Sequence, residues 1–313
     1  MGWLWTRPCS IKFFNLLFTF ASSIFSMILY RFNWQPSETL FEIGDFGIHV
    51  YSLMFIVAFG LGYYIMRNIY KNENVKIAEL ESLFTYMVIA VLLGARLGDV
   101  FFYSWDYYKD HLIEILLPIR ENPNASLFFG LIDGYAFSGY KGLASHGAVI
   151  GVLVGLWLYQ IRHKYQSFIW LLDRITIPIT IGGCFVRIGN FFNSEIVGKY
   201  TNTDFGVVFI NNNETLPRHP AQLYEVIGYF ILWLFLRRIY KTDKRNYPGY
   251  LIGVMFTGMF TIRFIIEFVK EKQGGIEDYL PGLSTGQWLS IPLIIVGIYL
   301  IIRSIRKGPV TNS

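Results

Sequence analysis

Residues 250–268 read YLIGVMFTGMFTIRFIIEF, an apolar run interrupted by one arginine and one glutamate. About 20 such residues are enough to cross the hydrocarbon core of a bilayer as a helix. Comparable runs occupy residues 11–30, 46–66, 82–103, 143–161, 168–186, 222–236 and 286–302, of which 222–236 is short for a full span. Because backbone groups in lipid have no water to bond, each run is expected to be helical, and the short alternating strands of a membrane barrel are absent from the sequence.

The composition of the whole chain also indicates a membrane protein. Of its 313 residues, 53% are hydrophobic and 16% are charged, whereas a soluble domain carries about 25% charged residues. A soluble enzyme, a disordered tail and a collagen-like fibre are therefore excluded. Cys9 and Cys184 show neither CxxC nor Cys/His spacing, so we expect no metal or other cofactor, and Cys184 is expected to pack as a small apolar residue. The predicted fold class is all-α, a polytopic helical membrane protein.

The loops between the runs predict the orientation of the chain. The loops on one side of the membrane carry thirteen Lys and Arg residues, and the loops on the other side carry eight. The loops with thirteen basic residues are also shorter in total length. Since cytoplasmic loops hold the excess of basic residues, the C-terminus is expected in the cytoplasm, and the longest loops, with the active site, are expected to face outward. The formal charge of +5 then needs no nucleic-acid partner.

The first 30 residues admit three explanations. Arg7 and Lys12 before an apolar run are compatible with a signal peptide, with a signal anchor, or with an upstream extension preceding a true start at Met27. We therefore divide the chain into an N-terminal hydrophobic extension, 1–30, and an integral-membrane domain, 31–313.

Two charged residues lie four positions apart inside the run 250–268. On a helix, Arg263 and Glu267 would share one face, so that the carboxylate holds the guanidinium in a fixed direction. Ionisable groups in a membrane span are costly and mark functional sites. The alternative is an internal salt bridge that lowers the cost of insertion, an explanation that suits Arg96 and Asp99 better than Arg263.

A second arginine, Arg187, lies in another segment and has amide neighbours. Two arginines near the outer membrane face would bind a phosphate in a bidentate manner. The commonest phosphate at that depth belongs to a phospholipid headgroup. The sequence therefore predicts a lipid substrate.

His146 lies near the outer end of the run 143–161 and is flanked by Gly142, Gly147 and Gly151. Small neighbours are expected to admit a substrate, and a histidine of ordinary pKa near 6.5 suits proton transfer at neutral pH. The alternative role is a hydrogen bond to a helix carbonyl. His219, before the next span, is expected to cap or anchor that helix.

The run from Arg187 to Gly198, RIGNFFNSEIVG, resembles the signature of the prolipoprotein diacylglyceryl transferase family, G-R-x-G-N-F-x-N-x-E-x-x-G. Four more runs resemble family motifs in the family's order: 94–98 (GARLG), 145–147 (SHG), 218–225 (RHPAQLYE) and 263–267 (RFIIE). The resemblance as a whole extends over about residues 33–303.

This resemblance implies an enzyme of seven core transmembrane helices, with an extra N-terminal hydrophobic helix if residues 1–30 are kept. The family transfers the sn-1,2-diacylglyceryl group from phosphatidylglycerol to the lipobox cysteine of a preprolipoprotein, which forms a thioether and releases glycerol phosphate. The implied partners are phosphatidylglycerol, preprolipoprotein signal peptides and membrane lipids. The implied location is the bacterial inner membrane, and no metal is implied.

The resemblance also assigns roles to individual residues. Arg187 and Arg263 would hold the lipid phosphate, and His146 would be the candidate base. The remaining residues of the phosphatidylglycerol site would be Tyr51, Asp173, Asn190, Glu195, Gly198 and Glu267.

Three positions depart from the family pattern: Val186 and Ala148 replace glycines, and Asp99 stands where tyrosine is frequent. We expect these changes to affect fine specificity rather than reaction class. The rival hypothesis is a membrane transporter or lipid-binding channel, whose intramembrane charges would line a pathway. Internal inverted repeats, which would favour it, are not found in the sequence.

Overall fold

The computed structural model describes residues 31–37, 39–43, 46–127, 132–137, 144–272 and 282–310. Each of the seven apolar runs after residue 45 overlaps one long helix. These helices are α2 (Val50–Asn72), α3 (Ile77–Phe102), α6 (Ser145–Arg162), α7 (Phe168–Phe192), α8 (Ala221–Tyr240), α9 (Tyr250–Ile266) and α10 (Thr285–Lys307). The predicted helix at 11–30 lies outside the described residues, as does the rest of the N-terminal extension.

Five of the described helices are long and apolar enough to cross a membrane, namely α2, α3, α7, α9 and α10. The apolar helix α6 is shorter, and α8 combines Glu225 with two arginines in its last turn. The predicted class, an all-α membrane protein, is confirmed, whereas the count of seven spans stays a prediction.

Strands that the sequence analysis did not predict lie before α2 and in the connections between later helices. β1 (Arg31–Trp34) pairs in parallel with β6 (Gly206–Phe209). Two antiparallel pairs join β2 (Thr39–Ile43) to β3 (Phe46–His49) and β4 (Ile119–Leu127) to β5 (Ile132–Phe137). The short helices α4 (Trp105–Tyr108) and α5 (Ile113–Leu116) follow α3.

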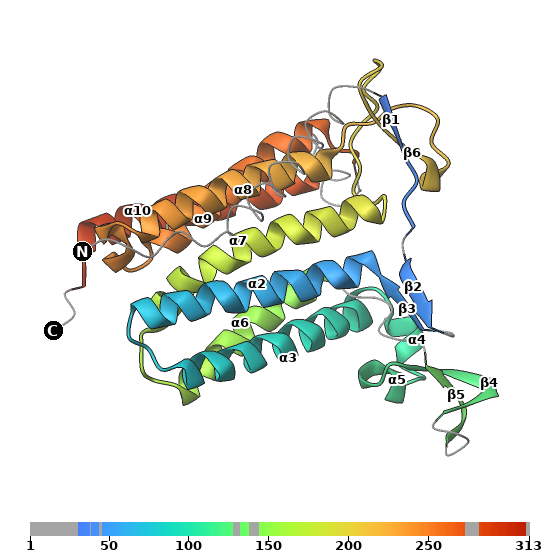
Figure 1. Ribbon diagram of the computed structural model, residues 1–313, viewed down its shortest axis with the longest axis horizontal. Coiled ribbons are helices and arrows are strands. Elements are labelled where there is room, and N and C mark those ends of the chain that lie inside the picture. Colours follow the sequence, from blue (N-terminus) through green and yellow to red (C-terminus); the bar gives the residue numbers. More distant parts are fainter. Residues whose placement is uncertain are drawn as a thin grey trace, which may run out of the picture. The chain divides into compact units, whose positions relative to one another are not determined.

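The chain divides into two compact units. Unit 1 comprises the described residues up to Ile65 and from Leu172 onward, and unit 2 comprises Met66–Leu171. Within unit 1, α9 packs against both α8 and α10, and the three helices run side by side (Figure 1). Within unit 2, α3 packs along α6 (Figure 1).

Glycines bring α3 and α6 into backbone contact. A Cβ atom on Gly147 would lie 2.1 Å from the carbonyl oxygen of Gly94 and 2.6 Å from Cα of Gly98. A Cβ on Gly151 would lie 2.1 Å from the carbonyl of Ala90. Small residues four apart allow this approach between membrane helices. The expectation that Gly147 and Gly151 leave room for a substrate is therefore wrong, because both pack against α3.

An apolar cluster in unit 1 joins α7 to α8. Ile181, Cys184 and Tyr229 are its buried members, and Met259 of α9 packs against them. Cys184 is 3% exposed, which confirms that it packs as a small buried side chain. This cluster fixes the end of α7 from which the signature run continues.

Asp173, near the start of α7, fixes the start of α9. Its carboxylate accepts hydrogen bonds from the backbone N–H groups of Gly249, at 2.7 Å, and Ile252, at 3.0 Å. The first N–H groups of a helix have no partner within the helix, and a carboxylate there also opposes the positive end of the helix dipole. Asp173 thus caps α9.

Arg96 of α3 holds the segment after that helix in unit 2. Its Nη2 donates to the carbonyl of Glu114 at 2.6 Å, and its Nε donates to the carbonyl of Ile115 at 3.0 Å. The guanidinium also lies over the ring of Tyr108, 4.6 Å from its centre. These contacts give Arg96 a structural role in anchoring α5.

Candidate active site

Arg187 lies in the penultimate turn of α7 and is the centre of a buried polar cluster in unit 1. Its Nε forms an ion pair with Oε2 of Glu225, and its Nη1 donates to Oδ1 of Asn190 at 2.7 Å. It also hydrogen bonds to Tyr229, one turn after Glu225 on α8. The Glu225 side chain is only 1% exposed, so its charge requires this partner. The arginine is therefore held in one direction by three neighbours.

The signature run after Arg187 folds back on itself to complete the cluster. Asn190 Nδ2 donates to Oε1 of Glu195 at 2.7 Å, and Gln222 Nε2 donates to the backbone carbonyl of Glu195 at 2.6 Å. Ser194 and Ile196, on either side, adopt positive φ values of 54° and 59°. Such backbone conformations are unfavourable for residues other than glycine and are retained where surrounding contacts demand them.

Tyr51, at the start of α2, joins the same cluster. Its ring lies against Gly189, where a Cβ would come within 2.6 Å of the ring carbon Cδ2. Tyr51 also hydrogen bonds to Asn190. A side chain at position 189 would displace the tyrosine, which explains why the signature has glycine at this point.

Lys270 is a buried cation that the sequence analysis did not identify. It is 3% exposed, and its Nζ lies 3.6 Å from Oε1 of Glu225 and 3.3 Å from Oε1 of Glu267. The other oxygen of Glu267 accepts a hydrogen bond from Ser284 Oγ at 3.2 Å. Lys270 therefore links the carboxylate on α8 to the carboxylate that follows α9.

Arg263 is not paired with Glu267 as the sequence predicted. Its side chain has neither an ion pair nor a hydrogen bond to any residue in the described part of the chain. It lies close enough to Tyr229 for the two groups to interact electrostatically. Tyr229 thus lies near both arginines, and Arg263 makes no ion pair within the described residues.

Gly198 brings the chain segment of Lys270 against the signature run. Gly198 and Lys270 form an antiparallel bridge, and Gly198 N–H donates to the carbonyl of His219 at 2.9 Å. A Cβ on Gly198 would lie 2.4 Å from that carbonyl. His219 contacts Tyr224, in the first turn of α8, through Nδ1 at 3.2 Å, and burial lowers the pKa of His219. Only glycine fits where these segments meet.

A comparison with protein families identifies the chain. Residues 38–303 match the model of the family described as prolipoprotein diacylglyceryl transferase. The chain belongs to this family. It is accordingly a transferase, and this membership favours the transferase hypothesis over a transporter or lipid-binding channel.

Curated relatives agree with the family assignment. A phosphatidylglycerol–prolipoprotein diacylglyceryl transferase of Tolumonas auensis is 39% identical over 274 residues, which cover 88% of this chain and 98% of the relative. Enzymes of the same name from Bacteroides fragilis and Chloroherpeton thalassium are each 38% identical, over 87% and 90% of this chain and 95% and 97% of their own lengths. Their names state the donor lipid and the acceptor protein on which those enzymes act.

The structure brings together most of the site residues that the family resemblance implied. Unit 1 gathers Arg187, Asn190, Glu195 and Tyr51 around one network, and Gly198 and Glu267 are connected to it through Lys270. Asp173 is an exception. It precedes Arg187 by fourteen residues on the same helix, a separation of about 21 Å along the axis, and it caps α9. We assign Asp173 to the stability of unit 1 rather than to the lipid site.

His146 lies in the first turn of α6, in unit 2. Its side chain is outside the part of the chain that the structure describes, so its role as a base stays a prediction. Among the described residues, one group has the composition of a metal site: His111, Glu114 and Glu121 have ligand atoms within 4.8 Å of one another. These residues also bond to each other and to Tyr107.

Two important members of the cluster were missed or underrated by sequence reasoning. Tyr229 follows Glu225 by four residues on α8, and Lys270 follows Glu267 by three. The spacing of Glu225 and Tyr229 places both side chains on one face of α8, so a search for polar partners of Glu225 would have found Tyr229. Lys270 lies beyond the end of α9, where helical spacing gives no such signal.

Proposed function

We propose that the chain transfers the diacylglyceryl group of phosphatidylglycerol to the lipobox cysteine of preprolipoproteins, forming a thioether and releasing glycerol phosphate. The observation that carries this proposal is that Arg187 and Arg263 both lie near Tyr229. Two guanidinium groups near one tyrosine suit a phosphate diester, which has two unesterified oxygens to accept their hydrogen bonds. Membership of the family supports the reaction class.

The chemistry requires positive charge at the leaving group. The thiolate sulfur attacks the glyceryl carbon that bears the phosphate, the S–C bond forms, and the electron pair of the broken C–O bond moves to the departing phosphate. Preorganised donors at such a position are typically worth about 3 to 4 kcal/mol each. Because the thiol nucleophile belongs to the protein substrate, the enzyme needs no nucleophile of its own.

We assign different tasks to the two arginines. Arg187 is already fixed by Glu225 and Asn190, so binding lipid costs it little reorientation. Arg263 has no ion pair within the described residues, and we propose that the lipid phosphate becomes its partner. Lys270 balances Glu225 and Glu267 and prevents these carboxylates from repelling the phosphate.

We propose His146 as the base that takes the proton from the lipobox thiol. An imidazole of ordinary pKa is well matched to a thiol of pKa about 8.5. The test is the pH profile of His146→Asn: loss of the acidic limb, with a drop in rate, supports the role. An unchanged rate and an unchanged profile remove His146 from the mechanism.

The proposed reaction can be tested with purified protein, phosphatidylglycerol and a lipobox peptide. Mass spectrometry should detect a thioether-linked diacylglyceryl peptide, and an enzymatic assay should detect glycerol phosphate in equal amount. A peptide with serine in place of cysteine is the substrate control. Lys272→Ala, at an exposed residue near the site, is the matched control for Arg263→Ala. A wild-type protein that yields no thioether would overturn the proposal.

We further propose that the protein lies in the bacterial inner membrane, with the active site toward the outer face and the C-terminus in the cytoplasm. The distribution of basic residues supports this orientation. A single cysteine replacing the exposed Asn211, in a chain lacking Cys9 and Cys184, should react with an impermeant maleimide in intact spheroplasts. A cysteine replacing Lys307 should react only after permeabilisation, and the reverse pattern contradicts the orientation.

A further inference from the structure

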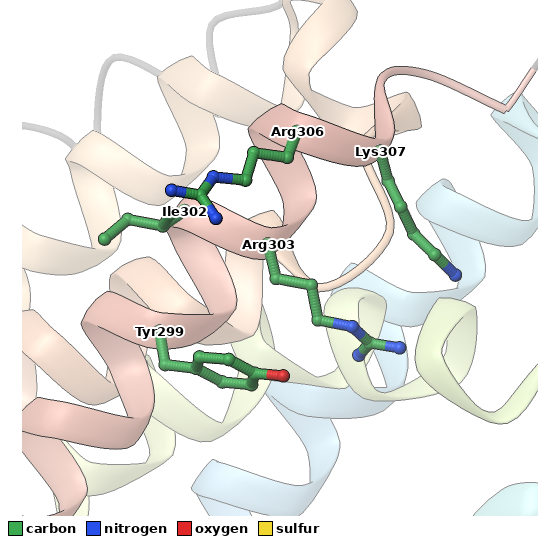
Figure 2. A pocket seen from close by; sticks show the side chains of 5 residues that line it. All are labelled: Tyr299, Ile302, Arg303, Arg306 and Lys307. Atoms are coloured by element: carbon green, nitrogen blue, oxygen red, sulfur yellow. The ribbon is translucent and has the colours of Figure 1, made fainter.

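The last two turns of α10 carry a hollow of about 310 Å³ that belongs to no part of the site described above. Its lining residues are Tyr299, Ile302, Arg303, Arg306 and Lys307. Figure 2 shows the hydroxyl of Tyr299 and the ends of Arg303 and Lys307 on one side of the helix, with Arg306 pointing to another. The hollow thus combines three cations with an aromatic and an aliphatic wall.

These cations have no counter-charge within the described residues. The side chains of Arg303, Arg306 and Lys307 are exposed and make no ion pair or hydrogen bond to any residue that the structure describes. Like charges three or four residues apart on a helix repel one another. An anion from outside the chain would remove this repulsion.

The helix dipole explains only part of the arrangement. Arg306 and Lys307 are in the last turn of α10, where positive charge is favoured by the unpaired carbonyls. Arg303 lies one turn earlier, and the dipole effect falls off within the last turn. The dipole therefore does not account for a third cation at this position.

The same helix continues the hollow with an apolar surface. Ile295, Ile298 and Ile302 are 61%, 45% and 46% exposed on a helix long enough to cross a membrane, and Tyr299 is 61% exposed. Exposed aliphatic side chains on such a helix face lipid tails, and tyrosine is enriched where the tails meet the headgroups. Arg303, Arg306 and Lys307 come after this apolar surface along α10, at the depth expected for lipid headgroups.

We propose that this hollow binds the headgroup of an acidic phospholipid, with the phosphate held by Arg303 and Lys307, Arg306 adding positive charge nearby, and an acyl chain lying along Tyr299 and Ile302. Charge complementarity and the adjoining apolar face select an anionic lipid over a soluble anion. Ser284, at the other end of α10, donates a hydrogen bond to Glu267 of the candidate active site. Helix geometry separates Ser284 from Lys307 by about 35 Å, so this is a second lipid site in the opposite leaflet, and it does not depend on the proposed reaction.

The test measures lipid binding to the full chain in detergent by native mass spectrometry. Phosphatidylserine is the probe, because it carries a net negative charge but is not the proposed substrate, and phosphatidylcholine is the neutral comparison. The triple variant Arg303→Gln, Arg306→Gln, Lys307→Gln removes the cations of the hollow. The matched control, Arg237→Gln, Arg238→Gln, Lys241→Gln, removes equal charge at the end of α8, where Arg237 already contacts the Trp233 ring.

We expect the wild type and the matched control to retain phosphatidylserine in preference to phosphatidylcholine, and the hollow variant to bind it about tenfold more weakly, as loss of several phosphate contacts predicts. Equal weakening in both triple variants would overturn the proposal in favour of a diffuse basic surface. Unchanged binding in the hollow variant would also overturn it, as would displacement of the lipid by millimolar glycerol phosphate, which indicates a site for a soluble anion. Retained helicity and transferase activity show that the variants are folded.

Discussion

Glu225, on α8, forms an ion pair through Oε2 with Nε of Arg187, on α7. Both side chains are largely removed from solvent, with exposed fractions of 1% and 14%. A buried carboxylate without a partner is strongly unfavourable, so the pair fixes the relative rotation of the two helices as well as the direction of the guanidinium. The orientation of Arg187 is therefore established before any substrate binds.

This pairing predicts that charge alone will not replace Arg187. In Arg187→Lys, one ammonium cannot bond Glu225 and Asn190 while also presenting a planar pair of donors to phosphate. We expect kcat/KM to fall by at least about 10²-fold, a loss comparable to that of one preorganised donor. Arg187→Ala should abolish turnover. Full activity in the alanine variant, inserted at wild-type level, would contradict the proposed role.

Lys270 should contribute to stability as well as to activity. Lys270→Met leaves Glu225 and Glu267 without the cation between them, and breaking a buried ion pair costs about 3 to 5 kcal/mol. We expect a marked fall in Tm in detergent together with loss of activity. Lys272→Met, two residues away and exposed, is the control and should leave both unchanged. A stable Lys270→Met enzyme of wild-type rate would show that the carboxylates need no such cation.

Asp173 should affect folding rather than substrate affinity. Asp173→Ala removes two hydrogen bonds to the start of α9, and loss of a helix cap costs about 1 to 2 kcal/mol. A lower Tm with unchanged KM for phosphatidylglycerol is the expected result. Asp243→Ala, at an exposed acidic residue nearby, is the control. A raised KM without a change in Tm would return Asp173 to the substrate site.

The segment after α3 should be more stable in mild acid than in mild alkali. His111 Nδ1 bonds the carbonyl of Tyr107, and its Nε2 lies 3.2 Å from Oε2 of Glu121. The hydrogen bond to Tyr107, together with Glu114 and Glu121, raises the pKa of His111 above its ordinary value of 6.5. The contribution of protonated His111 to the stability of this segment is thus fully present below pH 6.5. It is lost as the pH rises through the raised pKa of His111.

Hydrogen exchange of residues 113–121 measures this dependence, after correction for the intrinsic effect of pH. Protection should be greater at pH 6 than at pH 8 in the wild type, and His111→Gln should abolish the difference. Equal protection at both pH values in the wild type would contradict the ion pair between His111 and Glu121.

Hydropathy located the described long helices because the bilayer requires long, continuous apolar runs. The short strands were not predicted, because β1 pairs with β6 across more than 170 residues of sequence, and no local pattern specifies such a partner. The strands are also polar in part and lie outside the long apolar helices.

The predicted pairing of Arg263 with Glu267 was wrong for a definable reason. A spacing of four residues places two side chains on one face only within a continuous helix, but α9 ends at Ile266 and Glu267 begins a 3-10 turn, which changes the direction of its side chain. Glu267 pairs with Lys270 rather than with Arg263, and Lys270 is positioned by its bridge to Gly198, which is distant in sequence. A helical pattern within one segment cannot report a bridge between two segments.

The short strand β1 constrains how far the beginning of this protein can be trimmed. Trp34 donates its indole N–H to the carbonyl of Phe191 at 3.0 Å, at the end of the helix that carries Arg187, and its ring packs on that phenylalanine. A maturation step or an internal start codon that discards the leading hydrophobic stretch can therefore leave the catalytic region intact only if the new terminus precedes Arg31.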